Sequence, residues 1–423
     1  MSIASRCMFP VLVGLLIAST ASAHAQPITL SVAGRTAANP TIAAEGQFVA
    51  VAFSAATSSS MDVFLATSRD GGRTFATPTQ VNVVAGDARV SGEEPPYVAL
   101  VPRKGSTPDV VVVWTTRNGS TWKLVSARST NGGRTFGASA NVPGSEADGS
   151  RGWQSVAVDA NGRVLVLWLD HRGMATADST HKHGATASGQ PMPKADPTER
   201  AGLSKVLFGS LDSKSALTVA QSVCYCCKTS LAATGSNVYA VWRHVFPGGQ
   251  RDIAFSMSSD RGRAFSTPIR VGDDQWKFDG CPDNGPTIAV DLKRHVHVVW
   301  PTPVDGKDLS TMALFYAVSR DGRTFTERVR IPSRGMTSHP RMVLGVDGNP
   351  VVAWDEVVSG TRRLAMTRVR VDASGRATFV DLQAPDTGAG QWYPTVAAAA
   401  GGTLVAWVRQ VDKGSVVAVG LVK

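Results

Sequence analysis

The chain has 423 residues, 43% of them hydrophobic and 18% charged, and its formal net charge is +10. The basic residues are dispersed, many of them in a recurring Arg-Thr-Phe turn, and they form no basic run. This distribution excludes the basic stripe of a nucleic-acid-binding protein and favours a solvated, mildly basic surface.

The first 25 residues have the pattern of a secretory signal peptide. Arg6 precedes an apolar run from Met8 to Ile17, and small residues end the segment before Gln26. The run is too short to cross a membrane, so we expect cleavage near Gln26 and a periplasmic or secreted product with no membrane span. Cys7 would leave with the signal. Four of the five cysteines would then stay in an oxidising compartment, where disulfides persist.

A strong internal repeat covers the rest of the chain. An apolar, β-branched run ending in an aromatic residue recurs seven times, with the aromatic at Phe53, Trp114, Trp168, Trp242, Trp300, Trp354 and Trp407. A shorter strand precedes each run, and in most units two more strands with a Gly-rich turn between them follow. No segment has convincing helical periodicity. The sequence therefore predicts an all-β protein.

Repeated four-stranded units are typical of a β-propeller, because a closed ring of blades leaves few exposed strand edges. The last unit, residues 392–423, supplies only three strands, and residues 28–34 (ITLSVAG) are the natural fourth. Pairing of the two chain ends would close the ring. We therefore predict one β-propeller domain over residues 26–423, with seven blades, acting as a monomer.

Three turns resemble a motif of a known protein family. SRDGGRTF (Ser68 to Phe75), STNGGRTF (Ser129 to Phe136) and SSDRGRAF (Ser258 to Phe265) resemble the Asp-box, or BNR repeat, of sialidase-like propellers, and SRDGRTF from Ser319 is one residue shorter. In such a turn the Asp or Asn side chain caps the backbone and Gly supplies the unusual backbone angle. The resemblance implies a six-bladed sialidase-type ring as the alternative to seven blades. It also implies ligand binding on the face opposite these turns.

Several unusual segments map to that ligand-binding face. The loop that leads into blade four carries Cys224, Cys226 and Cys227, and the loop that leads into blade five carries Cys281. An insertion in blade three, residues 172–202, is rich in Pro and Gly. An insertion of this kind is a disordered loop or a lid.

The cysteine cluster leaves three chemistries open. Adjacent Cα atoms lie about 3.8 Å apart, which is shorter than a disulfide normally spans, so two ordinary bridges are awkward to build. Structural disulfides that include Cys281 are one alternative, and a redox-active pair is another. The third is a copper or zinc site, because soft thiolates suit these metals. Its candidate ligands are Cys224, Cys226, Cys227, Cys281, His181 and His183.

The resemblance also implies an exo-sialidase, in which three arginines clamp a sugar carboxylate and a tyrosine paired with a glutamate acts as nucleophile. The candidates in this chain are Tyr393, Glu356, an acid/base at Asp170, and the clamp Arg151, Arg243 and Arg409. The family's early Arg-Ile-Pro motif is missing from the first blade, since the one copy begins at Arg330.

Three functions therefore remain open. The favoured one is a binding or assembly module that takes a glycan or protein ligand through the cysteine-bearing face. The others are an exo-sialidase and a periplasmic copper-binding protein.

Overall fold

The computed structural model describes residues 26–118, 121–147, 149, 151–174, 197–278, 283–306 and 308–423. The predicted signal peptide, most of the blade-three insertion with His181 and His183, and Cys281 lie outside the described residues.

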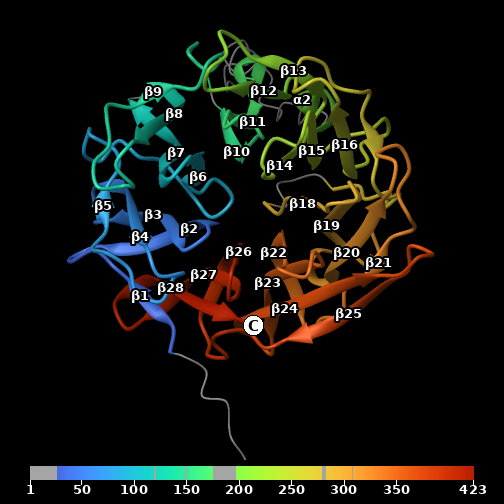
Figure 1. Cartoon of the computed structure of the whole chain (residues 1–423). Helices are drawn as coiled ribbons and strands as arrows, with labels where there is room; N and C mark the ends of the chain where they lie inside the picture. The colour runs from blue at the N-terminus through green and yellow to red at the C-terminus, as the bar shows by residue number, and fades with distance from the viewer. Residues whose placement is uncertain are drawn as a thin grey trace, which may run out of the picture.

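Seven four-stranded antiparallel sheets form a ring, as the repeat predicts (Figure 1). Blade 1 contains β2 (Thr36–Glu45), β3 (Phe48–Ala56), β4 (Met61–Ser68) and β5 (Thr79–Gln80). Blade 2 contains β6 (Tyr97–Arg103), β7 (Ser106–Asn118), β8 (Thr121–Ser129) and β9 (Ala140–Asn141). Blade 3 contains β10 (Arg151–Val158), β11 (Val164–Asp170), β12 (Lys205–Ser210) and β13 (Leu217–Gln221).

The other four blades repeat this order. Blade 4 contains β14 (Ser230–Thr234), β15 (Asn237–Arg243), β16 (Ile253–Ser258) and β17 (Ile269–Arg270). Blade 5 contains β18 (Thr287–Val290), β19 (Val296–Pro303), β20 (Met312–Ser319) and β21 (Val329–Arg330). Blade 6 contains β22 (Met336–Leu344), β23 (Pro350–Val358), β24 (Thr361–Val371) and β25 (Ala377–Leu382). The first strands of successive blades contact one another all round the ring, so they surround the central channel.

The chain ends close the ring, as predicted. Blade 7 contains β26 (Gln391–Ala399), β27 (Gly402–Val411) and β28 (Gly414–Val422), and its fourth strand is β1 (Ile28–Leu30). Ile28 pairs with Val419 and Leu30 with Val417. Figure 1 shows the blue N-terminal strand beside the red C-terminal one. The seven-bladed prediction is confirmed, and the six-bladed alternative is not needed.

The repeat aromatics form the core between blades. All six tryptophans of the repeat and Phe53 are essentially fully buried. Trp242 of blade 4 packs with Leu165 and Leu167 of blade 3, and Trp300 packs in the same way against blade 4. Each aromatic thus joins its own blade to the preceding one.

The Asp-box-like turns are held by their own side chains. Ser68 Oγ donates to Asp70 Oδ1 at 2.7 Å, and the same oxygen accepts the backbone N–H groups of Arg73 and Thr74, each at 2.9 Å. Gly72 adopts φ +86°. The turns that begin at Ser129, Ser258 and Ser319 repeat this pattern. The motif therefore uses its polar groups to fix the turn.

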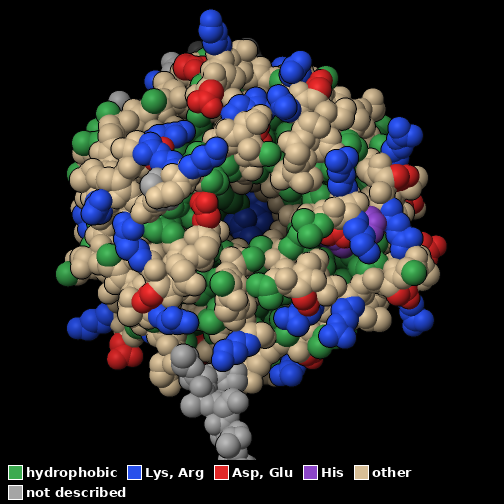
Figure 2. All heavy atoms as spheres, viewed as in Figure 1, with side chains coloured by type: hydrophobic (Ala, Val, Ile, Leu, Met, Phe, Trp, Pro, Cys, Tyr) green, Lys and Arg blue, Asp and Glu red, His purple; other side chains and the backbone are tan. Residues whose placement is uncertain are grey.

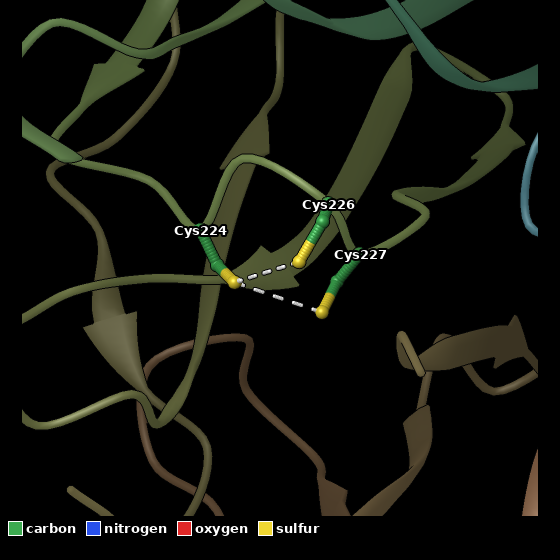
Figure 3. A group of neighbouring side chains, drawn as sticks. All are labelled: Cys224, Cys226 and Cys227. Atoms are coloured by element: carbon green, nitrogen blue, oxygen red, sulfur yellow. Dashed lines mark hydrogen bonds between the residues drawn. The ribbon is translucent and has the colours of Figure 1, made fainter. Parts of the chain in front are cut away.

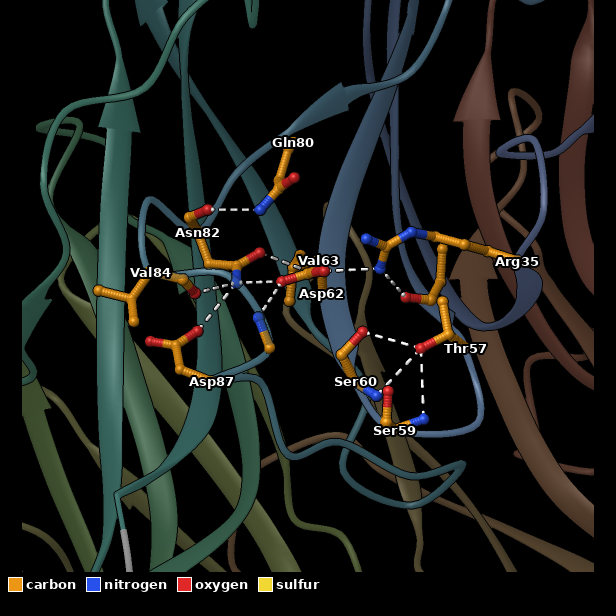
Figure 4. A network of polar contacts seen from close by, with 12 residues as sticks. Arg35, Thr57, Ser59, Ser60, Asp62, Val63, Gln80, Asn82, Val84 and Asp87 are labelled. Atoms are coloured by element: carbon orange, nitrogen blue, oxygen red, sulfur yellow. Dashed lines mark hydrogen bonds and ion pairs between the residues drawn. The ribbon is translucent and has the colours of Figure 1, made fainter.

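A buried polar network ties the closing segment to blade 1 (Figure 4). Arg35, which lies between β1 and β2, donates to Asp62 at 2.6 Å. Asn82 and the backbone N–H of Gly86 also donate to this carboxylate. Burial opposes ionisation, but these hydrogen bonds and the Arg35 charge outweigh it and hold the pKa of Asp62 below its usual value.

Helical structure is confined to short segments in the described part of the chain. The helix α2 (Pro197–Gly202) lies at the end of the blade-three insertion, and a 3₁₀ turn spans Leu309–Thr311. None of the described helices is long and apolar enough to cross a membrane.

Candidate functional site

The first strands of four blades contain a β-bulge near the channel mouth. At each bulge the register shifts and one residue adopts a positive φ: Asn39 (55°), Trp153 (50°), His339 (55°) and Tyr393 (50°). Residues other than glycine occupy this region only at an energetic cost, and such residues cluster at functional sites. The four bulges therefore indicate that the channel mouth is a candidate functional site.

His339 and Tyr393 share one buried carboxylate. The Nδ1 atom of His339 lies 2.7 Å from Oδ2 of Asp355, and the backbone N–H of Tyr393 donates to the same oxygen at 3.0 Å. Arg362 pairs with the other carboxylate oxygen of Asp355. The Asp355 side chain is fully buried. The Asp355 carboxylate favours the imidazole tautomer in which Nδ1 carries the hydrogen and donates it to the carboxylate. In that tautomer the Nε2 atom of His339 has a lone pair and can accept a proton.

The aromatic rings of this pair lie side by side, with centroids 4.1 Å apart. The Tyr393 ring also lies against Gly92, where an added Cβ would come within 1.9 Å of the ring. Burial, and then the negative charge of Glu93 and its neighbours, raises the pKa of Tyr393 above its usual value. The phenol therefore stays protonated at neutral pH and can act as a proton donor.

A buried ion pair lies at the same place. Lys228 Nζ is 3.1 Å from Glu93 Oε1, and both side chains are 1% exposed. Lys228 also donates to the carbonyl of Gly285, whose N–H donates to Glu93. Burial lowers the pKa of Lys228, although Glu93 opposes this shift. The pair links the loops that lead into blades 2, 4 and 5 across the channel.

A small recess in the channel brings these groups together. It is lined by Asn39, Pro40, Gly92, Glu93, His339, Arg341, Tyr393 and Pro394. Arg341 donates to the hydroxyl of Tyr97 and lies over its ring, 5.3 Å from the centroid. Figure 2 shows a hollow at the centre of the ring with hydrophobic walls and basic side chains at its floor. The recess thus combines an imidazole, a phenol and a guanidinium.

Two further acids near the mouth have raised pKa values. Burial raises the pKa of Glu94 to about 7, although Arg89 at 3.2 Å opposes the shift. For Asp283, desolvation and then the negative charge of Glu93 raise the pKa to about 6. Both carboxyl groups would change their charge within the physiological range.

The cysteine cluster lies in the loop between β13 and β14, which also carries Lys228. The Cys224 sulfur is 3.8 Å from the sulfur of Cys226 and 3.7 Å from that of Cys227 (Figure 3). Cys224 and Cys227 are free, buried thiols. Arg251 donates to the Cys224 sulfur at 3.1 Å. The predicted bridge to Cys281 and the histidine ligands His181 and His183 fall outside the described residues, so they stay predictions.

The three arginines proposed as a sugar clamp have separate partners. Arg151 is fully buried and donates to the carbonyls of Trp122 and Ala147. Arg243 is buried, donates to backbone carbonyls and lies over the Trp276 ring. Arg409 contacts the outermost strand through Thr29, and so these three side chains do not meet in the recess.

The proposed glutamate and aspartate also lie apart from Tyr393. Glu356 accepts the backbone N–H of Arg334 at 3.0 Å and lines a separate cavity of about 520 Å³. Its neighbour Asp355 is the carboxylate that reaches Tyr393, because successive residues of a strand face opposite sides. Asp170 pairs with Arg172 at 2.8 Å. The hydrolase assignment of these residues stays a prediction.

Four residues at the channel mouth were not singled out in the sequence: Glu93, Lys228, His339 and Arg341. One signal could have found the histidine. Three prolines, at 286, 340 and 394, recur every 54 residues, so the residues before them occupy the same place in blades 5, 6 and 7. Two of those residues are His339 and Tyr393.

No family model matches the sequence, and no curated protein matches it. Solved structures are similar to it at low sequence identity. An ulvan lyase of polysaccharide lyase family PL25 has a TM-score of 0.54 at 10% identity, over 93% of this chain and 95% of that one.

Two further solved structures have similar scores. A protein of unknown function from Dyadobacter fermentans has a TM-score of 0.51 at 13% identity, over 95% and 99% of the two chains. The GH93 α-L-arabinofuranosidase of Fusarium graminearum, solved with arabinobiose, has a TM-score of 0.51 at 12% identity, over 94% and 98%. These likenesses show the β-propeller fold alone.

Proposed function

We propose that this protein is an exported β-propeller that binds a carboxylated glycan over the channel recess and cleaves it by β-elimination. The observation that carries the proposal is the cluster of His339, Asp355 and Tyr393 beside Arg341. It offers a proton acceptor, a proton donor and a cation within one recess. The recess is too small for a sugar ring, so the sugar would lie over it.

Each group has a defined part in the reaction. Nε2 of His339 takes the proton from the carbon that bears the carboxylate, and Asp355 stabilises the resulting imidazolium. A double bond forms as the bond between the neighbouring carbon and the glycosidic oxygen breaks. Tyr393 donates its phenolic proton to that leaving oxygen. Proton transfer from the imidazolium to the phenolate, through solvent, restores the starting state.

Arg341 provides the electrostatic part of the mechanism. Negative charge builds up on the carboxylate of the sugar as the proton leaves, and a fixed cation beside it stabilises that charge. A planar guanidinium also binds a carboxylate in a defined orientation. Both effects favour an acidic sugar over a neutral one.

The similar structures support a carbohydrate ligand. The PL25 ulvan lyase has also been solved bound to -[GlcA(1-4)Rha3S]-, and this structure has a TM-score of 0.53. The GH93 enzyme is an arabinofuranosidase solved with a sugar. Because identity is 10 to 12%, they support the class of ligand and give no residue roles.

The test compares three substrates with the mature protein: a uronate-containing polysaccharide, a neutral polysaccharide and a fluorogenic sialoside. We expect ultraviolet absorbance from the new conjugated double bond with the uronate polymer alone. New reducing ends without that absorbance, or release of the sialoside fluorophore, would indicate hydrolysis and contradict elimination. Binding of the uronate polymer without cleavage would instead favour a glycan-binding module.

A further inference from the structure

The two free cysteines have the spacing of a metal-binding pair. Cys224 and Cys227 are separated by two residues, and their loop turns so that the two sulfurs lie 3.7 Å apart on the same side (Figure 3). The Cys226 sulfur is 3.8 Å from that of Cys224, and all three sulfurs lie within 4.8 Å of one another.

These distances match donors around one ion. A metal bound at about 2.3 Å from each thiolate places two donor sulfurs about 3.8 Å apart at a tetrahedral angle and about 4.0 Å apart at a trigonal one. A disulfide would need the two sulfurs at about 2.05 Å. Cys224 and Cys227 therefore lie at the separation of two donors that share one ion.

A cation lies beside the cluster. The Arg251 guanidinium donates to the Cys224 sulfur at 3.1 Å. Two thiolates with one monovalent cation carry a net charge of −1, which a neighbouring guanidinium can offset. Arg251 also fixes the direction of the Cys224 sulfur, as outer hydrogen bonds do for metal ligands.

The donor set selects the metal. Among the described residues the candidate group contains only cysteine, with no histidine or carboxylate. The free thiols of this group are Cys224 and Cys227, because Cys226 is disulfide-bonded. Two thiolates suit Cu(I), a soft ion that is satisfied by few donors, whereas Zn²⁺ completes four. The site is also closed to solvent, since the three cysteines pack with Ala201 of α2 and with Val245.

We propose that Cys224 and Cys227 are the anchoring ligands of a buried Cu(I) site, with the Cys226 sulfur beside them and Arg251 as the residue that positions Cys224. This site is separate from the channel recess, and its test does not depend on any activity toward glycans.

The test is anaerobic titration of the reduced mature protein with Cu(I) against a chromophoric Cu(I) chelator. We expect one tightly bound equivalent, which protects both thiols from alkylation. Cys224→Ser and Cys227→Ser should each weaken binding by at least 100-fold. Arg251→Met should weaken it by about 10- to 100-fold, because outer-shell partners have effects of that size. Arg73→Met, at an exposed turn arginine, is the matched control and should bind like the wild type.

Several results would overturn the proposal. They are the absence of Cu(I) uptake by the reduced wild type, uptake that survives the double serine variant, and a preference for Zn²⁺ over Cu(I). Isolation of the native protein with a Cys224–Cys227 disulfide that resists reduction would also overturn it. Thermal denaturation of each variant without metal shows that it is folded. The alkylation experiment on the wild type tests the site even if a serine variant fails to fold.

Discussion

The Lys228–Glu93 pair offers a quantitative test of how the channel mouth is held together. Lys228→Met removes the cation and leaves the Glu93 carboxylate buried. At 3.1 Å and an effective dielectric constant of about 20, the attraction between the two charges is about 5 kcal/mol. Loss of one partner of a buried pair typically costs about 3–5 kcal/mol. We therefore expect the free energy of unfolding to fall by about 4 kcal/mol.

The assay is thermal denaturation followed by circular dichroism. Unfolding entropy of about 2.1 cal/mol/K per residue gives about 0.9 kcal/mol/K for 423 residues, so Tm should fall by about 3–6 °C. The double variant Lys228→Met with Glu93→Gln removes both charges and should recover more than half of the loss. Lys413→Met, at an exposed turn, is the control and should leave Tm unchanged. A fall in Tm of under about 1 °C in the single variant, or a double variant that is no more stable than the single one, would contradict this expectation.

Three further predictions follow from other contacts. Glu94→Gln should flatten the pH dependence of stability. Because the folded-state pKa of Glu94 is about 7, ionisation of this carboxyl lowers the free energy of unfolding by about 3 kcal/mol as pH rises from about 4.5 to 7. The Tm values at pH 5 and pH 8 should therefore differ less in the variant than in the wild type. Gly92→Ala should displace the Tyr393 ring and lower kcat/KM on a uronate polymer by about 100-fold while Tm stays within 2 °C, and unchanged kinetics would contradict the placement of that ring. Asp62→Asn should cost about 2 kcal/mol in urea denaturation by weakening the Arg35 contact, and Arg35→Met should cost no more after that change.

The blades could be predicted because their signals are local and repeated. Each repeat aromatic ends the apolar run of a buried second strand. The last unit has only three strands, so it required a fourth from the N-terminal end. The pairing of Ile28 with Val419 follows from that count. The turns at Ser68 and Ser258 could be predicted for the same reason, since the hydrogen bonds of their Ser and Asp side chains lie within a few residues.

The site was harder to predict because it depends on contacts between distant segments. Glu93 and Lys228 are 135 residues apart and meet only when the ring closes. A bulge at His339 inserts one extra residue into the short strand β22, so its sequence signal is a single break in the alternation, which is hard to recognise. The choice between Asp355 and Glu356 depends on which face of β23 lies toward Tyr393 of blade 7, and this is set by register.

The central claim is that His339 is the proton acceptor of a site that cleaves a carboxylated glycan. The most direct measurement is kcat/KM for a uronate polymer, read from the absorbance of the double bond, in the wild type and in His339→Ala. His295→Ala, at a turn outside the recess, is the matched control. We predict a loss of at least 100-fold for His339→Ala, with binding of the polymer retained, and wild-type kinetics for the control. Equal rates in the wild type and His339→Ala would contradict the account.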